Sequence, residues 1–182
     1  MAEVFLRRDL ARRGVAASVS STGTISAGRP ASADAVEVLA DLGLDLSTHR
    51  SRVIDTEQVA GADLVLAMAR EHVREAAVVA PASYWRTFTL KELVRRADER
   101  GGPQPGESLD DWLARLGAGR SPTSHLGSSA GDDVADPIGQ RLSVYERTAT
   151  ELADLTDRLA ELLGRVAPTP APDPRPQPEE TP

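Results

Sequence analysis

The chain has 182 residues, enough for one domain of ordinary size. It is 40% hydrophobic and 27% charged with a net charge of −7, which excludes a fully disordered protein and disfavours nucleic-acid binding, because nucleic acid requires a concentrated basic surface. It contains no cysteine, so it offers no disulfide, zinc thiolate or thiol nucleophile. No apolar run reaches the ~18 residues of a membrane span, and we expect a cytoplasmic protein that binds no membrane.

The first part of the chain alternates helical patterns with short extended runs. Apolar spacing predicts a helix over residues 1–13, which ends at Gly14, and residues 15–19 resemble a short strand. Ser32 is placed to cap a helix over residues 33–42. A short helix over 56–62 is followed by the apolar run 62–68, which is typical of a strand buried on both faces.

The later part continues the alternation and then changes in composition. Helices are predicted over 69–79 and 89–99, with a strand over 84–90 between them. The second of these helices begins with a capping box, Thr89-x-x-Glu92. The remaining segments are a Gly/Pro/Ser-rich insertion at 101–131, expected to be mobile around one short helix, a long helix over 145–166 and a Pro-rich tail at 167–182, expected to be disordered.

Strands that alternate with helices predict an α/β domain over residues 1–166, with a small parallel sheet flanked by helices. A domain of this class is expected to begin with a strand, whereas this chain begins with the amphipathic helix "MAEVFLRRDLARRG". The first strand of the predicted sheet is therefore expected to be missing from the chain.

Several polar residues are candidates for a functional site, but each of them, taken alone, also has an ordinary structural interpretation. His49, in a polar loop, could anchor a site or be an ordinary loop histidine, whereas His72 and His125 are expected at the surface. Three scattered histidines without cysteine do not suggest a metal site. Asp136 precedes Pro137, which biases it toward an extended backbone. A carboxylate fixed in this way can act as a general acid, or the pair can be no more than a turn.

Taken in order, several stretches carry a resemblance. They are "MAEVFLRRDL", "SSTGTISAGRPAS", "VLADLGLDLSTHRSR", "ADLVLAMAREH" and "DVADPIG". With the closing helix, they make the chain resemble the low molecular weight protein-tyrosine phosphatase family from Met1 to Gly164, apart from the insertion. In that family a phosphate loop, C-x-G-N-x-C-R-S-P, directly precedes "MAE". The resemblance thus implies a three-layer sandwich whose first strand and nucleophile loop would lie upstream of Met1.

The resemblance also implies an activity and a set of site residues. The family hydrolyses phosphomonoesters through a phosphocysteine intermediate, without a cofactor or metal. Asp136, with Pro137, corresponds to its general acid. Ser21 and His49 correspond to residues that support the phosphate loop, and Ile25 lies near the substrate pocket. The implied partner is a phosphorylated protein, such as a phosphotyrosine protein, or a small phosphomonoester.

Three interpretations remain open from the sequence. The first is a phosphatase whose true start lies upstream and includes the cysteine loop. The second, suggested by the absence of cysteine, is a catalytically dead pseudophosphatase or a binding or regulatory module. The third is an unrelated α/β interaction protein. Ile138 and Gly139 follow the Asp-Pro pair where the family often has aromatic residues, which disfavours phosphotyrosine as the preferred substrate. The oligomeric state is open.

Overall fold

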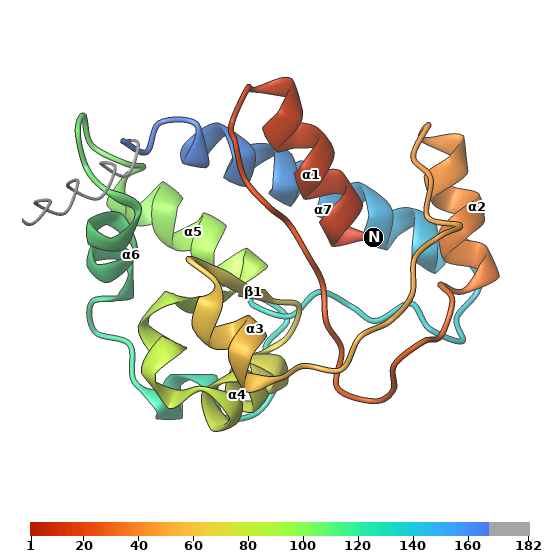
Figure 1. Cartoon of the computed structure of the whole chain (residues 1–182), viewed down its shortest axis with the longest axis horizontal. Coiled ribbons are helices and arrows are strands. Elements are labelled where there is room, and N and C mark those ends of the chain that lie inside the picture. Colours follow the sequence, from red (N-terminus) through yellow and green to blue (C-terminus); the bar gives the residue numbers. More distant parts are fainter. Residues whose placement is uncertain (168–182) are drawn as a thin grey trace, which may run out of the picture.

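The computed structural model describes residues 1–167, so all but the first residue of the predicted Pro-rich tail at 167–182 lies outside the described residues (Figure 1). Within this part, no helix combines the length and apolarity needed to cross a membrane. The elements, in chain order, are α1 (Ala2–Arg12), α2 (Ala33–Asp41), α3 (Thr56–Gly61), β1 (Val65–Ala67), α4 (Arg70–Val79), the 3-10 helix η1 (Pro81–Arg86), β2 (Thr87–Thr89), α5 (Leu90–Arg100), α6 (Leu109–Gly117), the 3-10 helix η2 (Pro122–His125) and α7 (Leu142–Leu163).

The sheet is small and parallel, which confirms the predicted α/β class. β1 pairs with β2 in a register that runs from Val65 opposite Thr87 to Ala67 opposite Thr89. The strand predicted over residues 15–19 is wrong, since this segment is irregular coil. A strand needs a neighbour to share its ladder, and residues 1–167 offer none to this segment.

β1 is less buried than its apolar sequence predicts. Only Ala67 is fully buried, whereas Val65 and Leu66 remain partly exposed. The cause is that β1 has a paired strand on one side only within the described part of the chain. Its other edge carries backbone N–H and C=O groups outside any ladder, which is the state of an edge strand.

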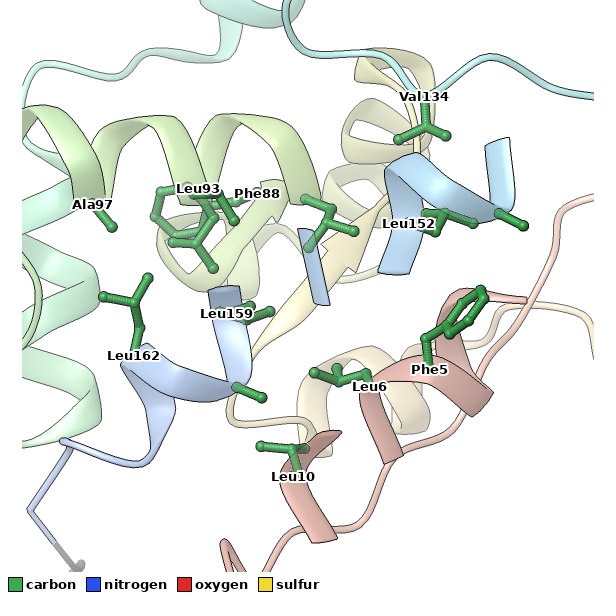
Figure 2. Close-up of a cluster of buried hydrophobic side chains, with 14 of the residues drawn as sticks. Phe5, Leu6, Leu10, Phe88, Leu93, Ala97, Val134, Leu152, Leu159 and Leu162 are labelled. Carbon is green, nitrogen blue, oxygen red and sulfur yellow. The ribbon is translucent and has the colours of Figure 1, made fainter. Parts of the chain in front are cut away.

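α1 packs along α7 (Figure 1). Phe5, Leu6 and Leu10 form the apolar face of α1, which points into the core cluster that also contains Leu152 and Leu159 of α7 (Figure 2). Such periodic burial is the main source of stability for a helix of this length.

A buried polar contact fixes how α1 and α7 meet. Asp9 of α1 is fully buried, and the hydroxyl of Thr156 on α7 donates a hydrogen bond of 2.9 Å to its Oδ2. Arg8 donates to the other oxygen, Oδ1, at 2.7 Å. A buried carboxylate with both oxygens paired tolerates little displacement, so the direction of α1 is specified as well as stabilised.

The predicted insertion contributes to the core. Its helix α6 buries Trp112, Leu113 and Leu116 completely, in the same cluster as Phe88 of β2. His125, which was expected at the surface, is 1% exposed. That expectation was wrong because the partner that holds His125 lies on α5, far away in the sequence.

Candidate functional site

Two of the predicted site residues, Ser21 and His49, meet at the first turn of α1. The hydroxyl of Ser21 donates a hydrogen bond to Oε2 of Glu3, and Nδ1 of His49 lies 4.0 Å from the same oxygen. Arg7, one turn along α1, donates to Oε1 of Glu3. Glu3 is therefore the residue that joins them, and sequence reasoning missed it. The available signal was its i, i+4 spacing to Arg7.

The surroundings of Glu3 favour its charged form. Burial by itself would raise the pKa of Glu3, but the hydrogen bonds from Ser21 and Arg7 and the charges of Arg7 and His49 outweigh it, so the pKa lies below its ordinary value. An anionic carboxylate in the first turn of a helix also interacts favourably with the helix dipole. Glu3 thus acts as a fixed negative centre that orients Ser21 and His49.

A polar cavity of about 260 Å³ opens beside this cluster. Its lining includes Glu3, Arg7, His49, Arg50 and Arg52. Arginine groups present several N–H donors in a fork, the geometry that binds carboxylate and phosphate oxygens. Arg7 is already paired with Glu3, so Arg50 and Arg52 are the arginines of this lining whose guanidinium groups are available to an anionic group.

The loops that carry Ser21 and His49 are joined to each other through their backbones. The N–H of Gly23 donates to the carbonyl of Arg52 at 2.7 Å, and the N–H of Ile54 donates to the carbonyl of Gly23 at 2.9 Å. Ile25 follows on the first of these loops with 89% of its surface exposed, and it does not line the cavity. Its role in a substrate pocket stays a prediction.

Asp136 and Pro137 lie on a separate anchored loop. The buried Val134, two residues earlier, donates its backbone N–H to the carbonyl of Met68 at 2.8 Å, which ties the loop to the end of β1. Oδ1 of Asp136 accepts a hydrogen bond of 3.0 Å from the N–H of Ile138, a turn typical of Asx residues. Within residues 1–167 the carboxylate has no other hydrogen-bond partner and makes no ion pair with the residues around Glu3. The loop therefore presents an exposed carboxylate in a defined orientation.

The chemistry available to these groups is limited. The 182 residues include no cysteine. In the part of the chain that the structure describes, no three His, Asp or Glu side chains gather in a way that could hold a metal ion. The structure therefore presents two separate features, an arginine-lined cavity beside Glu3 and the exposed carboxylate of Asp136.

A family model and curated relatives place the chain among known proteins. The model described as "Low molecular weight phosphotyrosine protein phosphatase" matches residues 1–110. The chain belongs to this family. A protein-arginine-phosphatase of Geobacillus stearothermophilus is 31% identical over 146 residues, which are 80% of this chain and 76% of that protein. A probable low molecular weight protein-tyrosine-phosphatase, EpsP, of Ralstonia nicotianae is 37% identical over 129 residues, 65% of this chain and 87% of that protein.

Solved structures of low molecular weight phosphatases share the fold. The protein tyrosine phosphatase from T. tengcongensis superposes with a TM-score of 0.65 and 33% identity, covering 88% of this chain and 87% of that one. A YwlE arginine phosphatase mutant with a phosphorylated active-site serine gives a TM-score of 0.66 at 29% identity, over 89% of this chain and 85% of that one. The fold predicted from the resemblance is thus confirmed.

Proposed function

We propose that this chain is the part of a low molecular weight phosphatase that follows the phosphate loop. In this proposal it hydrolyses phosphorylated proteins only when a strand and a cysteine-bearing loop are joined ahead of Met1. The observation that carries the proposal is the combination of family membership with the absence of any cysteine. The family's chemistry needs a thiolate, and this chain supplies none.

The proposed mechanism assigns separate roles to the two parts. The cysteine thiolate of the added loop attacks phosphorus, the bond to the leaving group breaks, and Asp136 gives its proton to the departing atom. In the second step Asp136 takes a proton from water, which attacks the phosphocysteine and releases phosphate. The exposed, oriented carboxylate of Asp136 and the loop restraint by Pro137 support this role.

Ser21 and His49 are proposed to support the phosphate loop by hydrogen bonding. In the described chain they meet at Glu3, in the first turn of the helix whose N-terminus would follow the loop. Backbone N–H groups and the dipole at such a helix end stabilise bound phosphate. The carboxylate of Glu3 holds both side chains close to that end.

The partly exposed edge of β1 supports the proposal independently. Several apolar side chains from the coil at 15–19 and from the region of β1 pack against the same core cluster but remain partly exposed. They are Val15, Val19, Leu64, Leu66 and Met68. An added parallel strand would pair with the free edge of β1 and cover part of this apolar surface.

The second candidate function is a pseudophosphatase, a binding or regulatory module without turnover. The observation in its favour is again the absence of cysteine. For the 182-residue chain by itself we expect no phosphatase activity under either proposal, so the decisive comparison is with an extended protein.

The experiment compares three proteins in the release of p-nitrophenol from p-nitrophenyl phosphate. They are the 182-residue chain, the chain extended by a relative's first strand and phosphate loop, and the extended protein with the nucleophilic cysteine replaced by serine. We expect activity only in the second. Activity of the 182-residue chain would overturn the need for the loop, and an inactive but folded extended protein would favour the pseudophosphatase.

Substrate choice belongs to the same proposal. The relatives are named for phosphotyrosine and for phosphoarginine, so the extended protein is assayed on matched peptides that carry one or the other. Ile138, which is 70% exposed, follows the Asp-Pro pair and offers no aromatic wall, so we expect no preference for phosphotyrosine. A cytoplasmic location is also proposed, because a reducing compartment keeps a thiolate nucleophile free.

A further inference from the structure

Arg29, Arg50 and Arg52 lie in two loop segments that contain no acidic residue, and Asp45 and Asp55 border the second of these segments. Residues 15–33 and 46–54 include Arg29, Arg50 and Arg52 but no Asp or Glu, in a chain that has 28 acidic and 21 basic residues. In a protein of net charge −7, such a local excess of positive charge is a departure from the average surface. It concentrates the attraction for anions at one place.

The three arginines lack acidic partners within residues 1–167. Arg29 and Arg52 make no ion pair and donate no side-chain hydrogen bond in this part of the chain, and all three residues are exposed. In the described part of the chain, Arg50 donates only to backbone carbonyls, those of Ser47 and His49. Other arginines do pair: among them, Arg95, Arg115 and Arg158 contact carboxylates at 2.7–2.9 Å.

The scaffold beneath these arginines is fixed by hydrogen bonds. The hydroxyl of Ser51 donates to the carbonyl of Ser26 at 2.7 Å and accepts from the N–H of Arg29 at 3.0 Å. The N–H of Gly28 donates to the carbonyl of Ser51 at 2.8 Å, and Gly28 has φ +78°, a conformation that favours glycine. A surface that is already ordered loses little entropy when a ligand binds.

Apolar side chains lie on the same pair of loops. Ile25 is 89% exposed on one loop and Val53 is 43% exposed on the other. We define the arginine surface as Ile25, Arg29, Arg50, Arg52 and Val53. It combines positive charge with an apolar contact, the composition of a surface that recognises a peptide rather than a bare ion.

We infer that the arginine surface binds an acidic segment of a protein, in which Asp or Glu side chains pair with the arginines and an apolar side chain contacts Ile25. Arg50 and Arg52 of this surface also line the cavity beside Glu3 and His49, so the surface adjoins the candidate site. The identity of this segment rests on the proposed function: it is the part of a phosphorylated substrate protein that flanks the phosphorylated residue. An extended nucleic acid fits less well, because the chain as a whole is acidic.

The test measures peptide binding and not turnover. Its result therefore does not depend on whether the protein is an active phosphatase. Fluorescence anisotropy compares two peptides that share a central leucine, one with flanking Glu and Asp and one with Gln and Asn in their place. Both are made with and without phosphotyrosine, and each is titrated with the 182-residue chain. We expect the acidic peptides to bind more tightly with or without the phosphate, and to weaken between 50 and 300 mM salt as exposed charges are screened.

The variant Arg29→Gln/Arg52→Gln is the direct probe, because neither side chain holds the loops together. We expect it to weaken binding of the acidic peptide about 2- to 30-fold, the range for two exposed ion pairs. The matched control is Arg12→Gln/Arg147→Gln, which removes two exposed arginines elsewhere and has the same net charge. We expect it to bind as the parent does.

Three outcomes would overturn the inference: equal affinity for the acidic and neutral peptides, equal losses in the two double variants, or tighter binding of a single-stranded oligonucleotide that the Arg29→Gln/Arg52→Gln variant abolishes. Circular dichroism of both variants has to match the parent. If the extended protein lacks phosphatase activity but the acidic peptide still binds as expected, the proposed function fails and the arginine surface stands.

Discussion

Nε2 of His125 lies 3.0 Å from Oε2 of Glu92, and both side chains are almost completely buried. Nε of Arg120 donates to Oε1 of the same carboxylate at 2.9 Å, and its guanidinium lies 3.8 Å from the ring centroid of Phe88. The hydroxyl of Tyr84 is 3.2 Å from Nδ1 of His125. One buried carboxylate on α5 thus holds two side chains of the segment at 101–131.

Removal of the Glu92 carboxylate is expected to destabilise the protein strongly. Glu92→Gln leaves Arg120 buried without a counter-charge, and breaking one side of a buried ion pair costs about 3–5 kcal/mol. Urea unfolding followed by circular dichroism measures the change. The control is Glu99→Gln, on the same helix, which breaks an exposed pair with Arg95 and is expected to cost at most about 1 kcal/mol. Equal losses in both variants would contradict the buried role of Glu92.

The same carboxylate predicts a dependence of stability on pH. Burial raises the pKa of Glu92, but the hydrogen bond from His125 and the charges of Arg120, His125 and Arg96 lower it to about 2, from an ordinary value of 4.5. The unfolded chain therefore binds this proton more readily than the folded one. The contribution to stability is complete above pH 4.5 and is lost as the pH falls toward 2.

Unfolding free energies between pH 4.5 and 2 test this dependence. One extra proton bound by the unfolded state corresponds to a slope of up to about 1.4 kcal/mol per pH unit. We expect Glu92→Gln to reduce the slope by up to that amount. An identical slope in the parent protein and in Glu92→Gln would show that the carboxylate is not held in its charged form.

The parts of the fold that sequence predicted well are those with local signals. Ser32 accepts a hydrogen bond from the N–H of Ala35, and Thr89 from the N–H of Glu92, so both predicted caps are present. Gly14, with φ +67°, ends α1 as expected. Only half of the predicted capping box forms, because the Glu92 carboxylate turns to partners in the segment at 101–131 instead of back to Thr89.

The parts that sequence could not predict depend on distant partners. The segment 15–19 has the composition of a strand, but strand formation depends on a neighbour. His125 sits among Gly and Ser residues and looks exposed until Glu92 is known to face it. Likewise, the meeting of Ser21 and His49 at Glu3 joins three separate stretches of chain. The sequence suggested Ser21 and His49 as site residues, which stays a prediction, but it could not show that they meet at Glu3.

Helix α6 provides a test of whether the segment at 101–131 belongs to the core. Leu116→Ala empties a completely buried position, and such truncations cost about 2–5 kcal/mol. Urea unfolding measures the loss. Leu126→Ala, in the same segment but 63% exposed, is the matched control and is expected to change stability by less than about 0.5 kcal/mol. If Leu116→Ala lowered the free energy of unfolding as little as Leu126→Ala does, α6 would not be part of the core.

The Glu3 junction is tested by titration of its carboxyl carbon in NMR spectra. Ser21 donates one of the hydrogen bonds that hold the pKa of Glu3 below its ordinary value, so Ser21→Ala is expected to raise that pKa. Ser18→Ala, on the same coil but exposed and without a side-chain hydrogen bond in residues 1–167, is expected to leave it unchanged. If Ser21→Ala also left the pKa of Glu3 unchanged, Ser21 would not be bonded to Glu3 in solution. The proposed support of the phosphate loop would then lose its structural basis.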